Sequence, residues 1–242
     1  MSALKTAPKA LGQLPLNIAL RDDASFANFF ADSNVEAVTA IEALSKADAG
    51  EYFIYIWGNS AVGKTHLLQA ACREQAAFQA PAAYLSLRDA DVAPPILEGL
   101  ETLSLVCIDD VEVIAGQEEW EVALFYLYNR LRANNGRLLV SASTSPTHSK
   151  VRLLDLRSRL AAGLVLQIAD LSDEGKIAAL QLHAQHRGLE LPDEVGQFIL
   201  RRSPRDLRVL IGLLEQLDKA SLAAGRKLTV PFVKQIIQDM TP

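Results

Sequence analysis

The sequence predicts an α/β fold, with a five-stranded parallel sheet covered by helices and a small helical domain after it. Three observations support this prediction. Short apolar segments typical of buried strands alternate with amphipathic helical segments up to about residue 170. A complete glycine-rich motif, G-x-x-x-x-G-K-T, follows the first of those strands. From about residue 171 onward the periodicity is helical only.

The glycine-rich motif lies between a predicted strand at residues 52–57 and a predicted helix that follows it. Glycines let a backbone fold around an anion with its N–H groups inward, and the helix N-terminus adds partial positive charge. Lys64 would reach the β- and γ-phosphates, and the Thr65 hydroxyl would hold Mg²⁺. We therefore predict an ATP or ADP site at Gly58, Asn59, Ser60, Ala61, Val62, Gly63, Lys64, Thr65 and His66.

A second group of candidate residues follows the third predicted strand, at residues 103–108, which ends in Asp109 and Asp110. In a P-loop nucleotidase an acid at this point holds Mg²⁺ opposite the loop threonine, so Thr65 and Asp109 form the predicted metal site. Asp110 stands where many such enzymes carry a water-activating glutamate, and it is one methylene shorter. We expect it to position water poorly and intrinsic hydrolysis to be weak; capping of the next turn is its alternative role.

The fourth predicted strand, residues 137–143, is tipped with the hydroxyl residues Ser141 and Ser143. The carboxyl ends of strands face the ligand crevice in open α/β sheets. Either serine could therefore sense the γ-phosphate or position water.

The remaining elements follow from the same patterns. Capping side chains at residues 32–34 and an apolar stripe predict a helix over about 34–46. A core-facing stripe predicts another helix over 118–133, which Asn134-Asn135-Gly136 ends. Two more strands are predicted at 82–87 and 163–168, with a short helix at 153–160. In the C-terminal part, helices are predicted to follow Ser172, Pro192, Arg205 and Thr229.

Composition places the chain among ordinary globular proteins. It has 242 residues, of which 50% are hydrophobic and 22% charged, and its formal net charge is −5. A negative balance argues against autonomous, sequence-specific DNA binding. The N-terminus does not resemble a signal peptide, and no apolar run is long enough for a membrane span, so we expect a cytoplasmic protein.

The cysteines and histidines show no metal-site spacing. Cys72 and Cys107 lie far apart in apolar stretches, which predicts buried free thiols in a reducing compartment. His183 and His186 are three residues apart on a polar-looking helix, and we expect them to be solvated.

The N-terminal region contains an extended apolar peptide after a small polar leader at residues 1–12. Its proline blocks a helix at this point. On apolar content alone, packing of this peptide onto the domain is favoured over binding to a partner. The peptide consists of Gln13, Leu14, Pro15, Leu16, Asn17 and Ile18.

The order of these features resembles that of an AAA+ ATPase, and within that superfamily the bacterial replication initiator DnaA. The shared features are the phosphate loop, Asp109, the hydroxyl-tipped strand, Ser158-Arg159 before the fifth strand, and Arg205 at the start of a lid helix. The nearest local match is the segment Ile108-Asp109-Asp110-Val111-Glu112-Val113-Ile114-Ala115-Gly116.

The resemblance covers roughly residues 20–240, and the initiator's DNA-binding domain has no counterpart before Pro242. A shortened initiator homologue with an N-terminal Gln-Leu-x-Leu peptide resembles the Hda family. This implies an AAA+ P-loop fold with a clamp-binding segment (1–19), an α/β nucleotide-binding domain (20–170) and a helical lid domain (171–242).

The resemblance also implies roles for particular residues. The peptide at residues 13–18 would bind the DNA polymerase III sliding clamp (β), with Gln13 in one pocket and Leu16 and Ile18 in a hydrophobic one. Arg159 would be an arginine finger that acts in trans on ATP held by DnaA, and Arg205 would touch the phosphates of the chain's own nucleotide.

Together these features predict a negative regulator of replication initiation that activates hydrolysis in its partner, DnaA. Three alternatives remain open: a self-sufficient AAA+ ATPase such as a DnaC-like helicase loader, an interaction module with a structural nucleotide, and a clamp-loader subunit. The oligomeric state, including homo-oligomers, is also left open by the sequence.

Overall fold

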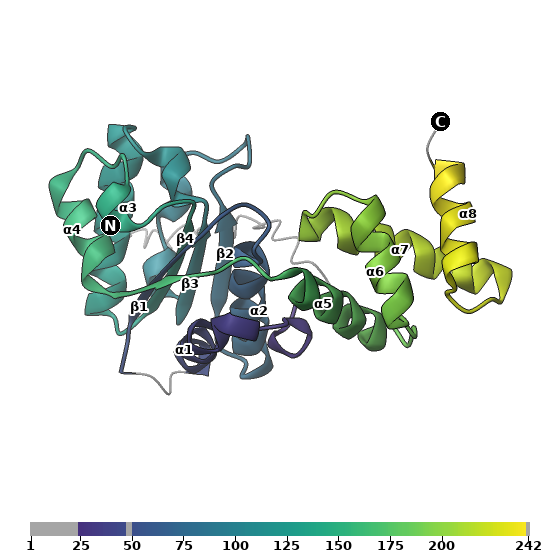
Figure 1. Ribbon diagram of the computed structural model, residues 1–242. Coiled ribbons are helices and arrows are strands. Elements are labelled where there is room, and N and C mark those ends of the chain that lie inside the picture. The colour runs from purple at the N-terminus through teal and green to yellow at the C-terminus, as the bar shows by residue number, and fades with distance from the viewer. Residues whose placement is uncertain (1–23, 47–49, 241–242) are drawn as a thin grey trace, which may run out of the picture.

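The computed structural model describes residues 24–46 and 50–240 and has a parallel sheet at its centre (Figure 1). The strand order is β2-β3-β4-β1-β5, and every neighbouring pair is parallel. The predicted five-stranded parallel sheet is therefore confirmed. Its strands are β1 (Phe53–Trp57), β2 (Ala82–Ser86), β3 (Leu105–Asp109), β4 (Arg137–Ala142) and β5 (Leu164–Gln167).

Helices cover both faces of the sheet, which explains why its strands are apolar almost throughout. Ile54 and Ile56 of β1 face α1 (Val35–Lys46) and α2 (Lys64–Ala77). Phe53 and Tyr55 of the same strand face the opposite core, which includes α3 (Glu118–Ala133) and α4 (Leu154–Ala162). Short 3₁₀ helices occur at Phe26–Asn28, Asp32–Asn34, Pro94–Leu97, Leu100–Thr102, Val111–Ile114 and Pro146–His148.

The strand register brings the polar residues at the ends of the strands to one edge. Ser86 of β2 pairs with Asp109 of β3, and Ser141 of β4 pairs with Ile56 of β1. The phosphate loop leaves β1 immediately after this edge, so the loop, Asp109 and Ser141 meet there. This is where ligands bind in open α/β sheets.

The C-terminal helices form a separate small core beside the sheet domain (Figure 1). The predicted N-cap Ser172 accepts a hydrogen bond from the Gly175 amide at 3.0 Å. Asp206 caps α7 by accepting from two amides, and Gly225 ends that helix at φ +60°. The helices are α5 (Asp173–His186), α6 (Asp193–Arg202), α7 (Leu207–Ala224) and α8 (Val230–Met240).

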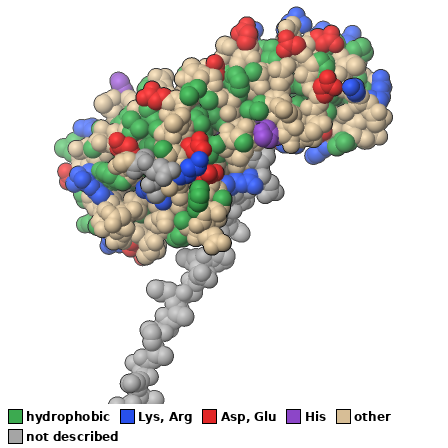
Figure 2. Space-filling model, turned by 90° about the horizontal axis from the view of Figure 1, so that it is seen from below, with side chains coloured by type: hydrophobic (Ala, Val, Ile, Leu, Met, Phe, Trp, Pro, Cys, Tyr) green, Lys and Arg blue, Asp and Glu red, His purple; other side chains and the backbone are tan. Residues whose placement is uncertain are grey.

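The surface carries charges of both signs, and both cysteines are buried. Lys or Arg and Asp or Glu side chains are interspersed on the face drawn in Figure 2. Cys72 and Cys107 are free and buried, as predicted. None of the helices in the described part of the chain is both long and apolar enough to cross a membrane.

Candidate nucleotide-binding site

A cavity of about 570 Å³ lies between the edge of the sheet and the helical lid. This size is within the usual range for small-molecule sites, roughly 300–1,000 Å³. Its polar lining includes the phosphate loop and the acids at and after the end of β3. Its apolar lining includes Phe29, Phe30, Leu171, Ala179, Leu207 and Ile211.

In the glycine-rich loop, the backbone at Gly63 requires glycine. Gly63 has φ +96°, and a Cβ atom there would lie 2.6 Å from a ring carbon of Phe29. Only glycine avoids both the strain and the clash. The buried Lys64 directs its Nζ atom to the carbonyl oxygens of Gly58 and Asn59, at 2.7 Å each. Burial lowers the pKa of Lys64, against the opposing negative charges of Glu112, Asp110 and Asp109.

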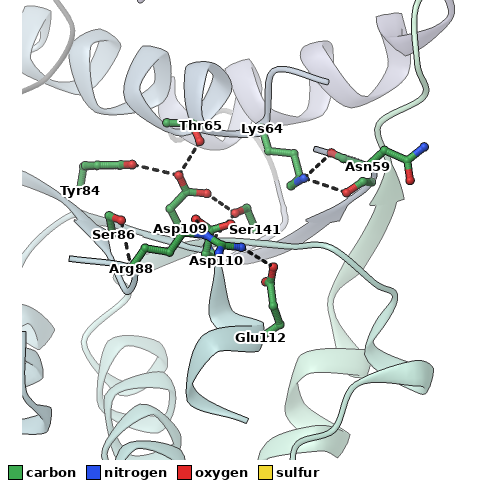
Figure 3. A network of polar contacts seen from close by, with 11 residues as sticks. Asn59, Lys64, Thr65, Tyr84, Ser86, Arg88, Asp109, Asp110, Glu112 and Ser141 are labelled. Atoms are coloured by element: carbon green, nitrogen blue, oxygen red, sulfur yellow. Dashed lines mark hydrogen bonds and ion pairs between the residues drawn. The ribbon is translucent and has the colours of Figure 1, made fainter. Parts of the chain in front are cut away.

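The Asp109 carboxylate is the centre of a hydrogen-bond network that Figure 3 shows. It is 2% exposed. Its Oδ2 atom accepts from the Thr65 hydroxyl at 2.7 Å and from the Tyr84 hydroxyl at 2.9 Å, and its Oδ1 atom accepts from Ser141. Burial, and then the charge of Asp109, raise the pKa of Tyr84, so this phenol stays protonated and donates.

Asp110 has a left-handed backbone conformation, and neighbouring groups bind both its amide and its carboxylate. Its backbone is left-handed, at φ +60°, and its amide donates to Ser141 Oγ at 3.0 Å. The Arg88 Nε atom donates to its Oδ2 atom at 2.6 Å, and Arg88 Nη2 also donates to Glu112 Oε1 at 3.2 Å. The other oxygen of Glu112 is buried and has no hydrogen-bond partner in the described part of the chain.

These residues fit a nucleoside polyphosphate with Mg²⁺. The Lys64 ammonium and the loop suit phosphate oxygens, and Thr65 and Asp109 supply the hard oxygen atoms that Mg²⁺ prefers. Within the described residues, no group of three or more His, Cys, Asp or Glu side chains could hold a metal ion by itself. A Mg²⁺ ion here would therefore complete its shell with phosphate oxygens and water.

Two family models and several solved structures match parts of this chain. A model of the bacterial DnaA ATPase domain matches residues 86–167, and a model of the Hda lid domain matches residues 173–237. Domain III of the Thermotoga maritima initiator DnaA is structurally similar, with a TM-score of 0.74 and 21% identity over 91% of this chain and 98% of that one. The chain is a Hda/DnaA-like AAA+ protein. This combination indicates a regulator of replication initiation.

Other solved structures share the AAA+ fold. DnaA from Aquifex aeolicus bound to AMPPCP has a TM-score of 0.68 and 23% identity, over 82% of this chain and 66% of that one. A single-residue variant of Thermotoga maritima RuvB has a TM-score of 0.66 and 19% identity, over 90% of this chain and 72% of that one.

Most of the predicted binding residues of this AAA+ protein meet in the cavity. Ser143 is exposed on its rim, and the Asn59 amide donates to Asp170 at 2.6 Å. Asn59 therefore contacts another part of the chain, whereas most of the other predicted residues line the cavity. The cavity lining includes Ser60, Ala61, Val62, Gly63, Lys64, Thr65, His66, Asp109, Asp110 and Ser143.

The expectation that His183 is solvated is wrong. Its side chain is 8% exposed and lies 6.2 Å, between ring centroids, from His66. The reason is tertiary: α5 packs against the 3₁₀ helix at Phe26–Asn28, and His183 lines the cavity. His186 is exposed, with its Nε2 atom 3.2 Å from the Ala27 carbonyl oxygen.

Arg205 lies outside the cavity lining. Its side chain is 66% exposed and forms an ion pair with Asp173 at 3.0 Å. Arg208, in the first turn of α7, lines the cavity instead. A contact between Arg205 and phosphate therefore stays a prediction.

Arg159 also lies outside the cavity, on α4. Its guanidinium carbon lies 5.9 Å from the centre of the Tyr128 ring on α3. Arg157, on the same helix, is exposed. The role of Arg159 as an arginine finger therefore stays a prediction.

Sequence analysis missed three residues of the polar network: Tyr84, Arg88 and Glu112. Tyr84 lies within β2 and Arg88 just after it, two positions that no motif marks. The pairing of β2 with β3 brings Tyr84 within hydrogen-bond distance of Asp109, and no pattern in the sequence marks this pairing.

Proposed function

We propose that this chain is a negative regulator of DNA replication initiation that acts on the initiator DnaA. It binds ADP or ATP with Mg²⁺, docks on the DNA-loaded sliding clamp, and presents Arg159 to ATP held by the initiator. The observation that carries this proposal is the Hda lid match, which follows a DnaA ATPase match along one chain. An AMPPCP-bound DnaA with the same fold supports an adenine nucleotide as the ligand.

The chain's own residues would hold the nucleotide rather than hydrolyse it rapidly. Lys64 and the loop amides would bind the phosphates, and Thr65 and Asp109 would hold a hydrated Mg²⁺, which would neutralise phosphate charge. The Asp110 carboxylate is engaged by Arg88 at 2.6 Å. An acid in an ion pair is a weaker hydrogen-bond acceptor for water, so slow intrinsic turnover is expected.

Arg159 would supply a guanidinium to the initiator's nucleotide from a second protein. A guanidinium placed against the transferred phosphoryl group stabilises the charge of the transition state, and it accelerates related reactions about 10³–10⁵-fold. In this chain Arg159 is partly exposed and remains outside the nucleotide cavity, as a finger for another subunit requires.

Clamp docking rests on sequence alone. The peptide at residues 13–18 lies outside the described residues. Its short Gln-Leu-x-Leu pattern suits a peptide that anchors in small apolar pockets. Docking through it would raise the local concentration of Arg159 near an initiator on the same DNA.

The test is ATP hydrolysis by purified initiator, with and without this chain and DNA-loaded clamp. We expect hydrolysis to rise only when all three are present. Gln13→Ala should abolish clamp binding while ADP affinity is unchanged, and Arg159→Ala should keep clamp binding yet lose stimulation. Arg157→Ala, an exposed arginine on the same helix, is the matched control.

The opposite pattern would overturn the proposal. If the initiator's rate does not rise and the isolated chain turns over ATP rapidly, a self-sufficient ATPase such as a DnaC-like helicase loader is the better account. Normal clamp affinity in Gln13→Ala would refute the peptide assignment alone.

A further inference from the structure

Helix α3 holds the start of α4 through one buried carboxylate. Glu121 is 1% exposed, and its two oxygens accept hydrogen bonds from three backbone amides. The Leu153 amide donates at 2.7 Å, the Arg152 amide at 3.0 and 3.1 Å, and the Gly116 amide at 2.6 Å. Leu153 is the N-cap residue of α4, so this carboxylate fixes where the helix that carries Arg159 begins.

Glu121 provides hydrogen-bond acceptors for backbone amides near the start of α4. The amide of Leu153, the N-cap residue of α4, has no partner inside the helix, and Arg152 directly precedes it. A buried carboxylate satisfies them and complements the positive end of the helix dipole. The Leu153 side chain makes no capping hydrogen bond, and the contact of Glu121 is with the backbone at and just before this N-cap position.

The same helix contacts the Arg159 side chain directly. Tyr128 lies seven residues after Glu121 on α3, two turns along the same face. The Arg159 guanidinium carbon lies 5.9 Å from the centre of the Tyr128 ring, within cation–π range. The ring itself is fixed: it is 2% exposed, packs edge-on against Phe53 at 5.3 Å, and its hydroxyl lies 2.9 Å from the Tyr52 hydroxyl.

We infer that Glu121 and Tyr128 are positioning residues for Arg159. Glu121 sets the backbone from which the arginine extends, and Tyr128 restrains the direction of its guanidinium. The inference rests on the proposed trans-acting role of Arg159. A finger restrained before contact loses less side-chain entropy when it enters the partner's site. Helices α3 and α4 lie together at the side of the sheet domain away from the lid in Figure 1.

The two contacts make different predictions for substitutions. Tyr128→Leu removes the ring and should lower the maximal stimulation of initiator hydrolysis about three- to tenfold, the scale of a partly exposed cation–π contact. Tyr128→Phe keeps the ring and is the matched control, with stimulation close to that of the unmodified chain. Glu121→Gln keeps the size of the side chain but turns one acceptor into a donor, and the resulting shift of α4 should cost roughly tenfold or more.

The measurements distinguish a loss of Arg159 positioning from a loss of binding or folding. For each variant we would measure the maximal stimulated rate, the concentration that gives half-maximal stimulation, and ADP affinity. Positioning residues should lower the maximal rate while the half-maximal concentration and ADP affinity stay unchanged. The Arg159 Nε–H signal in an NMR spectrum, assigned by its loss in Arg159→Ala, should shift in Tyr128→Leu because the ring current is removed.

The outcomes distinguish this inference from the function on which it rests. Full stimulation by Arg159→Ala would overturn both the finger role and the positioning role. Loss of stimulation in Arg159→Ala, with unchanged maximal rates in Tyr128→Leu and Glu121→Gln, would overturn the positioning role alone. If Glu121→Gln does not fold, the Tyr128 pair decides. The double variant Tyr128→Leu/Arg159→Ala should lose no more than Arg159→Ala, and an added loss would refute action through Arg159.

Discussion

Replacement of Asp109 by asparagine tests the metal assignment directly. The carboxylate is buried and accepts hydrogen bonds from Thr65, Tyr84 and Ser141. Asparagine keeps its size, and the three hydroxyl donors can rotate to meet the amide, so the domain should still fold. What is lost is the negative charge behind the Mg²⁺ position. Carboxylates that act on a metal through a bound water or another ligand typically contribute about 10–100-fold to metal affinity. The Mg²⁺-dependent gain in ADP affinity should therefore fall by about that factor, or roughly 1.4–2.7 kcal/mol.

The assay is a titration of fluorescent ADP against the protein, once with Mg²⁺ and once with a chelator. The unmodified chain should bind more tightly with Mg²⁺, and Asp109→Asn should show little difference between the two conditions. Asp91→Asn, an exposed acid after β2, is the matched control. Thermal unfolding of both variants checks the fold. A full Mg²⁺ effect in Asp109→Asn would refute the assignment of Thr65 and Asp109 as the metal site.

Three further predictions concern the loop, the lid and the buried thiols. Gly63→Ala should lose ADP binding, because its new Cβ atom would meet the Phe29 ring at 2.6 Å; wild-type affinity in the same titration would contradict the loop geometry. Asp173→Asn should tighten ADP binding by up to about fivefold if Arg205 reaches phosphate once released, since an exposed ion pair contributes about 0.2–1 kcal/mol. Unchanged affinity in both Asp173→Asn and Arg205→Ala would count against that contact. Burial raises the pKa of Cys107, so iodoacetamide should modify it only as the protein unfolds; rapid labelling of native protein, followed by mass spectrometry, would show otherwise.

The sequence predicted those features that lie close together along the chain. The phosphate loop is one contiguous motif whose chemistry requires its residue types, so Lys64 and Thr65 could be placed without a structure. The strand end at Asp109 could be placed because apolar strands of parallel sheets are distinct from the helices between them. The helix cap at Ser172 also depends on a short-range hydrogen bond alone.

Features created by tertiary contacts could not be predicted in this way. Arg88 reaches Asp110 because β2 and β3 pair in a particular register, and no local pattern encodes that register. His183 looks polar on its own helix, yet it is buried because α5 packs against a segment far away in the sequence. Glu121 reads as a surface charge in a helix, and its burial depends on the loop before α4.

Two arginines, Arg88 and Arg159, bear on the proposed division between holding a nucleotide and acting on a partner. Arg88 engages Asp110, the acid that would otherwise position water for the chain's own nucleotide. Arg159 lies outside that cavity, with its guanidinium over the Tyr128 ring of α3. His183 and Arg208 of the lid line the same cavity as the phosphate loop, so a bound nucleotide would link the lid to the sheet domain and stabilise the folded state in proportion to its occupancy. If the proposed function holds, slow hydrolysis of the chain's own nucleotide would preserve this link between lid and sheet domain while Arg159 acts on the partner.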